Sequence, residues 1–210
     1  MNQTLQEPAA NTSVPEGPPG SKREESFDLP AFAYNHRGSL VAIPLVAAVF
    51  CTWRQTEGTT AIWAAAGIVF MVGLLIRIWA QQYLHFRLRM NMMLTTGGPY
   101  TLMRNPIYIG NTLICIGVTI ASMTLWMVPV TLVACMIVYR FVVRYEERYL
   151  TARYGEPYAA YTKQVPRWVP NFRNGFKNLW APHYLGPSIK TELYNFLFLV
   201  PAILKAYLVR

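Results

Sequence analysis

Two polar segments hold the side chains that could do chemistry, and each lies directly against an apolar run. The first, residues 97–110, reads GGPYTLMRNPIYIG, and the second, residues 139–150, reads YRFVVRYEERYL. If the second segment is helical, Tyr139, Val143 and Glu146 share one face. Ionisable groups this close to apolar runs are costly unless they are paired or functional. The two segments therefore indicate either a ligand-binding site or an interfacial belt in which arginine and tyrosine reach lipid headgroups.

The order of residues in the first segment favours a binding site. Gly97 and Gly98, followed by Pro99, permit a turn. Pro106 suits the first position of a helix, where its missing N–H costs nothing. The backbone N–H groups at that helix start could bind an anionic or carbonyl group of a ligand. We therefore expect a turn and then a helix that begins beside a ligand.

The elements that would position these segments are apolar runs at residues 39–53, 60–80, 107–123 and 124–143. A helix of roughly 20 apolar residues crosses a bilayer. The last two runs have no polar linker between them, which predicts a helical hairpin. A further stretch, residues 193–209, is read as a fifth span or an interfacial helix, and we favour the span. The sequence thus predicts an all-α integral membrane protein with four to five transmembrane helices.

Composition supports a membrane protein. The chain has 210 residues, 53% of them hydrophobic, and a mean hydropathy of +0.23, which is more apolar than a soluble domain needs. A net charge of +9 could indicate nucleic-acid binding, but the sequence contains no recognisable nucleic-acid-binding module. Membrane lipid is therefore the expected partner. Three scattered cysteines match neither a disulfide framework nor a zinc site, and we expect no metal.

Positive charge predicts the orientation, because short loops rich in Lys and Arg stay cytoplasmic. Basic residues follow the second and fourth runs, whereas the linker 54–58 is short and nearly neutral. The amino terminus and the loops with residues 97–110 and 144–170 should therefore be cytoplasmic. We expect a disordered cytoplasmic tail at residues 1–37, two membrane spans at 38–92, a core with the hairpin at 93–170, and a carboxy-terminal extension at 171–210.

A family resemblance follows from the two segments taken together. GGPYTLMRNPIYIG, followed by EERYLTARYGEPYAAYTKQVPRWVP, resembles the isoprenylcysteine carboxyl methyltransferase family, which is related to membrane phospholipid methyltransferases. The match covers about residues 94–170. The resemblance implies that S-adenosylmethionine binds in a cytoplasmic pocket at the ends of the hairpin, without a Rossmann domain. The sequence agrees, because it has no GxGxxG motif after a strand.

The resemblance also assigns site residues. It implies an adenosyl pocket lined by Leu94, Thr95 and Tyr100. The turn of this pocket would be formed by Asn105, Pro106, Ile107 and Tyr108. Glu146 would hold a polar group of the cofactor. Arg104 and Glu147 would form a supporting pair, with Glu147 as the candidate base. The structural alternatives are interface anchors for the tyrosines, a plain helix start for Pro106, and an ion pair with Arg104 for Glu146.

Two departures from the family pattern concern the acceptor. Asn105 stands where many members have histidine, and an amide cannot act as a proton acceptor, although it can hydrogen-bond the cofactor. Val142 stands where the prenylcysteine enzymes place an arginine for the substrate carboxylate. Arg140, half a turn away, is the expected substitute. Cofactor binding is thus better supported than a prenylcysteine substrate.

The function expected from the resemblance is methyl transfer to a lipid-soluble acceptor. Prenylcysteine, a phospholipid amine, a small thiol and a quinone-like lipid all remain open as acceptors. One alternative is a membrane reductase of the sterol-reductase type that uses a nicotinamide cofactor, although such enzymes are longer and have more spans. The other is a non-catalytic membrane protein whose basic loops bind anionic lipid.

Overall fold

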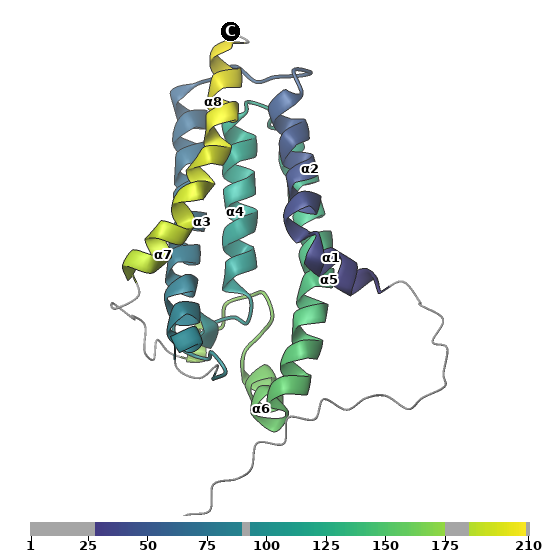
Figure 1. The fold of residues 1–210 in the computed structure, drawn as a ribbon. Coiled ribbons are helices and arrows are strands. Elements are labelled where there is room, and N and C mark those ends of the chain that lie inside the picture. Colours follow the sequence, from purple (N-terminus) through teal and green to yellow (C-terminus); the bar gives the residue numbers. More distant parts are fainter. Residues whose placement is uncertain (1–27, 90–92, 175–184, 209–210) are drawn as a thin grey trace, which may run out of the picture.

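The computed structural model describes residues 28–89, 93–174 and 185–208, and within these ranges it contains helices and no strands. The longer helices run side by side along one axis (Figure 1). The predicted all-helical class is confirmed. In chain order the α-helices are α1 (Leu29–Asn35), α2 (Arg37–Phe50), α3 (Thr60–Arg89), α4 (Pro106–Ala121), α5 (Met127–Tyr154), α6 (Glu156–Gln164), α7 (Leu185–Glu192) and α8 (Leu199–Leu208). The 3-10 helices are η1 (Gly98–Thr101), η2 (Phe172–Asn174) and η4 (Leu193–Phe198).

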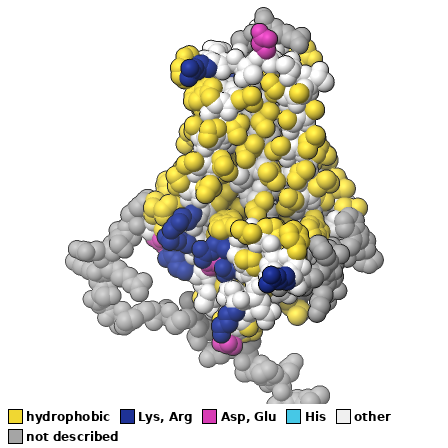
Figure 2. Space-filling model, turned by 180° about the vertical axis from the view of Figure 1, so that it is seen from behind, with side chains coloured by type: hydrophobic (Ala, Val, Ile, Leu, Met, Phe, Trp, Pro, Cys, Tyr) yellow, Lys and Arg dark blue, Asp and Glu magenta, His cyan; other side chains and the backbone are white. Residues whose placement is uncertain are grey.

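Two of these helices are long and apolar enough to cross a membrane: residues Thr60–Leu84 of α3 and Met127–Tyr154, which form α5. Helices α2 and α4 are apolar but shorter. In Figure 2 hydrophobic side chains cover the middle of the molecule, while most Lys and Arg side chains of that face gather toward one end. This distribution indicates association with a membrane.

Helices α3 and α4 pack with their backbones in direct contact. A Cβ on Gly73 would lie 2.7 Å from the carbonyl oxygen of Gly110, and one on Gly110 would lie 2.8 Å from that of Gly73. Gly117, two turns further along α4, lies equally close to the backbone of Phe70. Small residues permit this close approach between apolar helices, which gain little from hydrophobic burial in lipid. The contact fixes the start of α4 relative to α3.

The predicted hairpin is present. Helix α4 ends at Ala121 and α5 begins at Met127, and Met123 in the turn adopts a left-handed conformation with φ of 57°. Within the hairpin, the buried hydroxyls of Thr119 and Thr131 lie 3.1 Å apart. This bond links α4 to α5 in the buried interior, so both hydroxyls are satisfied.

The carboxy-terminal stretch differs from the single uniform helix expected at residues 193–209. It is a 3-10 helix, η4, continued by α8, and residues 209–210 lie outside the described part of the chain. Lys205 of α8 is buried, and its ammonium donates to the carbonyl oxygens of Ala48 (2.9 Å) and Cys51 (2.5 Å) and to the Thr124 hydroxyl (2.8 Å). A charge that looked misplaced in the sequence thus caps the end of α2.

The carboxy-terminal segment is also tied to α3. The Arg77 guanidinium donates to both carboxylate oxygens of Glu192, at 2.6 and 2.9 Å, and both side chains are buried. The Asn195 amide donates to the same carboxylate at 2.6 Å. These bonds hold α7 and η4 against the core of the bundle.

The amino-terminal part differs from the expected tail at its end. Residues 29–37, placed in that tail by composition, form α1 and the first residue of α2, whereas residues 1–27 lie outside the described part. The Tyr34 ring stacks on Tyr145 of α5 with centroids 4.7 Å apart, and Asp28 pairs with Arg148 at 3.2 Å. The apolar and aromatic side chains of this short segment therefore find their partners on a helix more than a hundred residues away.

Candidate functional site

A cavity of about 270 Å³ lies where α4 begins, between η1, α3, α5 and α1. The turn and helix start expected from the sequence form one side of it. The residues of α5 that face it lie one to two turns before the end of that helix. The lining residues are Tyr34, Leu84, Tyr100, Arg104, Asn105, Pro106, Ile107, Tyr108, Glu146, Tyr149 and Leu150.

Tyr108 and Glu146 form the polar centre of this cavity. The Tyr108 hydroxyl donates to Oε1 of Glu146 at 2.5 Å, which joins α4 to α5. The Tyr108 ring packs on Tyr139 with centroids 4.7 Å apart. A hydrogen bond to a carboxylate is among the stronger ones that a neutral donor makes. The pair therefore holds a negative charge in a fixed place at the rim of the apolar bundle.

A second cavity, of about 530 Å³, adjoins the first. The two share Leu84, Ile107, Tyr108 and Glu146 as lining residues. The second cavity extends into the bundle between α2 and η4, where apolar side chains alternate with the polar ones of Arg37, Arg77 and Asn111. The Tyr108–Glu146 pair thus lines both of two adjoining cavities.

The loop before α4 is held by the segment that follows α6. The backbone N–H of Arg104 donates to the Pro166 carbonyl at 2.9 Å, and the Asn105 amide donates to the Arg167 carbonyl at 3.1 Å. The Tyr161 hydroxyl donates to the Tyr100 carbonyl at 2.7 Å, and burial raises the pKa of this hydroxyl, so it stays protonated as a donor. Two motif fragments that are far apart in the sequence are thus bonded to each other.

Glu147 lies beside the site but does not line the first cavity. Its carboxylate accepts both arms of the Arg167 fork, at 2.9 and 2.6 Å, and pairs with Arg104 at 3.2 Å. The hydrogen bond to Glu147 raises the pKa of the Arg167 guanidinium above the ordinary value of arginine. A carboxylate shared by two guanidiniums would lose these bonds on taking up a proton. The geometry therefore suits Glu147 for holding the loop better than for accepting a proton.

Gly98 fixes the position of η1. Its φ is 58°, and a Cβ there would lie 2.2 Å from the Tyr83 ring. A glycine reaches this conformation without steric cost, and no larger residue fits under the ring. The close contact sets Tyr100, two residues on, at the wall of the cavity.

Replacing Gly98 by alanine is therefore expected to displace η1 and to weaken any ligand bound beside Tyr100. The left-handed backbone and the ring contact together should cost about 1–3 kcal/mol. Thermal unfolding and ligand titration of Gly98→Ala would measure both effects, with Gly155→Ala as the matched control. Gly155 also has positive φ, at 56°, but a Cβ there would meet nothing within 4 Å, so that control should lose stability without a specific loss of ligand affinity.

The structure brings together most of the residues that the sequence singled out. Three of the remaining ones lie elsewhere: Leu94 and Thr95 precede η1 and do not line the cavity, and Arg140 is exposed on α5 and lines neither cavity. Val142, where the family pattern has arginine, is fully buried. The cavity residues among the predictions are Tyr100, Arg104, Asn105, Pro106, Ile107, Tyr108 and Glu146.

Some lining residues were not anticipated. Tyr34 lies in the segment read as a tail, and no local signal marks it. Leu150 lies on the face of α5 that helical periodicity assigns to Tyr139 and Glu146, and Tyr149, three residues after Glu146, could have been found in the same way. Arg167 stands in the quoted motif between Pro166 and Trp168, where its charge was visible but its partner Glu147 was not.

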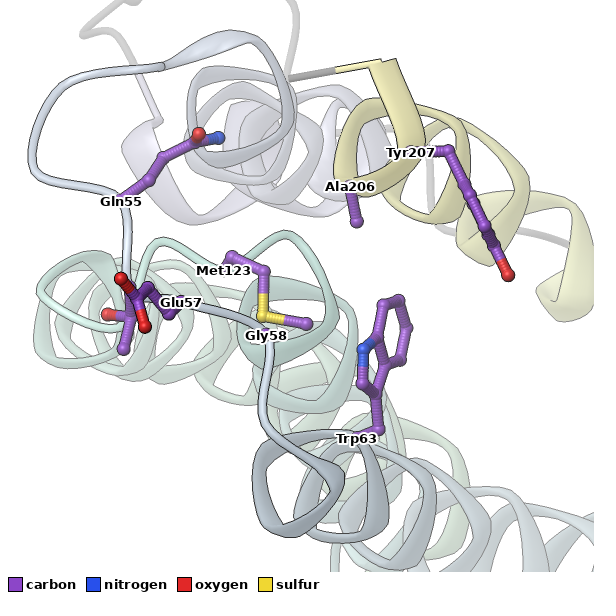
Figure 3. A pocket seen from close by; sticks show the side chains of 8 residues that line it. Gln55, Glu57, Gly58, Trp63, Met123, Ala206 and Tyr207 are labelled. Carbon is purple, nitrogen blue, oxygen red and sulfur yellow. The ribbon is translucent and has the colours of Figure 1, made fainter. Parts of the chain in front are cut away.

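A third hollow, of about 480 Å³, lies at the opposite end of the bundle, between the α2–α3 loop, the hairpin turn and α8 (Figure 3). It is larger than the first cavity but contains none of the predicted site residues. Its lining residues are Gln55, Thr56, Glu57, Gly58, Trp63, Met123, Ala206 and Tyr207.

Comparison with known proteins identifies the family. The chain is 29% identical, over 146 residues, to the cobalt-zinc-cadmium resistance protein CzcN of Cupriavidus metallidurans. That match covers 62% of this chain and 65% of the relative, so the chain spans somewhat less than two thirds of its length. No solved structure matches. The sequence model of the phospholipid methyltransferase family matches residues 53–157, which include α3, α4, α5 and the Tyr108–Glu146 pair. The chain belongs to the phospholipid methyltransferase family.

Proposed function

We propose that this protein is an integral membrane methyltransferase that uses S-adenosylmethionine and acts on a lipid-soluble acceptor. The observation that carries the proposal is the Tyr108–Glu146 pair, which lines two adjoining cavities and lies inside the segment matched by the methyltransferase family. The first cavity is the proposed cofactor site, and the second is the proposed acceptor site.

The residues of the first cavity fit a sulfonium nucleoside. Tyrosine rings of Tyr34, Tyr100 and Tyr149 line it together with the Glu146 carboxylate, and both kinds of group attract a cation in a water-poor site. Arg104 Nε is buried there and has no hydrogen-bond partner among the described residues. Within the same ranges, the buried hydroxyls of Tyr83 and Thr95, close to η1 in the fold or the sequence, also lack a partner. Such groups are expected to bind a ligand.

Bound there, S-adenosylmethionine would supply an activated methyl group, whose carbon–sulfur bond breaks with both electrons left on sulfur as an acceptor lone pair bonds to carbon. The chain's own contribution is alignment. Glu146, fixed by Tyr108, would orient the cofactor, and the shared wall would bring the acceptor atom to it in line. Asn105, whose amide is bonded to the Arg167 carbonyl, would keep the start of α4 in place.

We assign a positioning role to Glu147, because its bonds to Arg104 and Arg167 hold the loop and it lines neither cavity. Arg104 lines the first cavity, where its Nε would meet the cofactor. Arg140 was expected to bind an acceptor carboxylate. Its exposed position supports instead a contact with lipid headgroups. Arg37 lines the second cavity and forms no ion pair within the described ranges, so it is the arginine available to an acceptor there.

We further propose a multi-pass topology with the amino terminus and the cofactor site in the cytoplasm. Helices α3 and α5 support two spans by length and composition. The basic residues near the site, including Arg104, Arg144 and Arg148, support the cytoplasmic side. The opposite end has Arg54 and Glu57 in a short, nearly neutral loop.

The test is titration of the detergent-purified protein with S-adenosylhomocysteine and, in parallel, with reduced nicotinamide cofactors. We expect binding of the first and none of the second, followed by transfer of a labelled methyl group into a membrane lipid extract. Binding of a nicotinamide cofactor, or a folded protein that binds neither, would contradict the proposal.

A further inference from the structure

The hollow at the far end of the bundle has walls of two different kinds. In Figure 3, Gln55 and Glu57 lie on one side, Trp63 and Tyr207 lie on the other, and the thioether of Met123 lies between them. A carboxylate facing aromatic rings and a polarisable sulfur is a combination that favours a cation, above all an alkylated or primary ammonium group. The site described above has no part in this hollow, because none of its residues line it.

Three polar side chains of the hollow have no hydrogen-bond or ion-pair partner among the described residues. Within the described ranges, the Glu57 carboxylate forms no ion pair, although Arg54 lies only three residues away. The Arg54 guanidinium instead lies over the Trp53 ring, 5.1 Å from its centroid. In the same part of the chain, the Trp63 indole N–H and the Gln55 amide donate to no other residue. One negatively charged acceptor and two neutral donors are therefore available around one space.

The hollow is also held rigidly. The Thr56 N–H donates to the Met123 carbonyl at 2.9 Å, which fastens the α2–α3 loop to the hairpin turn. Lys205 fastens the start of the same loop to α8 through the Cys51 carbonyl. A Cβ on Gly58 would lie 3.3 Å from the Met123 methyl and 3.4 Å from the Trp63 nitrogen, so loop, turn and helix meet closely.

Backbone strain points to the same residue. Met123 adopts φ of 57°, which is unfavourable for a residue with an unbranched apolar side chain, and this conformation aims its thioether into the hollow. Left-handed non-glycine residues cost about 1–3 kcal/mol and persist where the surroundings enforce them, often at ligand sites. Glycine or asparagine would satisfy the turn alone, so the turn does not by itself explain a methionine.

We propose that this hollow binds the headgroup of a zwitterionic phospholipid, with the ammonium between Glu57 and the rings of Trp63 and Tyr207. The phosphate would accept from the Trp63 indole and the Gln55 amide, and the acyl chains would lie along the apolar surface of α8. Exposed apolar side chains of α8 next to the hollow, Ile203, Leu204 and Leu208, provide that surface. The lipid is a bound partner rather than the methyl acceptor, because the Tyr108–Glu146 pair lies at the other end of the bundle. This inference does not depend on the proposed methyl transfer.

Native mass spectrometry of the full chain, released from detergent with lipids of equal acyl chains, tests the proposal. We expect one retained phosphatidylcholine or phosphatidylethanolamine, with phosphatidylglycerol retained about threefold less, because Glu57 and Tyr207 are exposed and cation–π contacts at exposed sites are weaker than desolvated ones. Glu57→Gln and Trp63→Leu should each abolish the preference, and Glu156→Gln, an exposed carboxylate of α6 at the other end, should keep it.

Several results would overturn the proposal. Equal retention of phosphatidylglycerol by the wild type would exclude an ammonium site. Unchanged preference in Glu57→Gln would exclude this hollow. Glycerophosphocholine bound as tightly as the whole lipid would show a site for a soluble ammonium compound instead. Because Trp63→Leu could disturb packing, Trp63→Phe serves as a second variant, which keeps a ring but removes the indole donor and should lower retention only in part.

Discussion

Glu146→Ala is expected to lower the affinity for S-adenosylhomocysteine by about 10–100-fold, since a hydrogen bond to a charged group contributes roughly 1.5–3 kcal/mol. The substitution removes the only carboxylate among the described residues that line the proposed cofactor cavity, and it leaves the Tyr108 hydroxyl without its acceptor. Calorimetric titration of the purified variant would measure the loss.

Two further variants separate the charge from the hydrogen bond. Glu146→Gln keeps an acceptor for the Tyr108 hydroxyl and removes the negative charge, whereas Tyr108→Phe keeps the charge and removes the donor. We expect the glutamine variant to fold normally and still bind weakly, and the phenylalanine variant to lose less. Glu156→Gln, exposed on α6, is the control. Wild-type affinity in a folded Glu146→Ala protein would show that the ligand binds elsewhere.

Glu192→Ala is expected to destabilise the protein by about 3–5 kcal/mol, because it leaves a buried guanidinium without its partner. The Arg77 and Glu192 side chains are only 8% and 1% exposed, and the fork between them is bidentate. Asn195 would lose the same acceptor. Thermal unfolding in detergent, followed by fluorescence, should show a midpoint lower by about 10 °C.

The double variant Arg77→Met/Glu192→Leu tests the reason for that loss. Apolar residues of similar volume often replace a buried ion pair at little cost. We therefore expect the double variant to recover most of the stability lost in Glu192→Ala. A double variant as unstable as Glu192→Ala would mean that the ion pair itself holds α7 on α3, and that the loss in Glu192→Ala is not the cost of an unpaired charge.

Because Arg77, Tyr194 and Asn195 line the second cavity, the double variant should also change the use of acceptors while it keeps the affinity for the cofactor.

The helical core was predictable from the sequence because its signals are local. Continuous apolar runs place both ends of α2 and α4 within a few residues of the observed bounds, and Pro106 marks the start of α4. They also place the starts of α3 and α5, whereas both helices continue well beyond the apolar runs. The face of α5 with Tyr139 and Glu146 follows from helical periodicity. The family resemblance added the pairing between the two motif segments, which local patterns could not give.

What the sequence did not reveal depends on partners distant in the chain. Arg77 reads as a charge in an apolar helix until Glu192, 115 residues later, is placed against it. Lys205 reads as an interruption of a span until it meets the carbonyls at the end of α2. Tyr34 reads as part of a polar tail until it stacks on Tyr145. In each case the cost of a polar or unanchored residue is offset by a contact that composition and spacing do not encode.

The ammonium of Lys205 joins three elements at one end of the bundle. Its three donors are all engaged, two by the end of α2 and one by the hairpin turn, so α2, α8 and the hairpin are fastened at one level. The second cavity lies at the opposite ends of α2 and of the η4–α8 segment. The two ends of α2 are thus held separately, one by Lys205 and the other through α1, whose Tyr34 stacks on Tyr145 of α5.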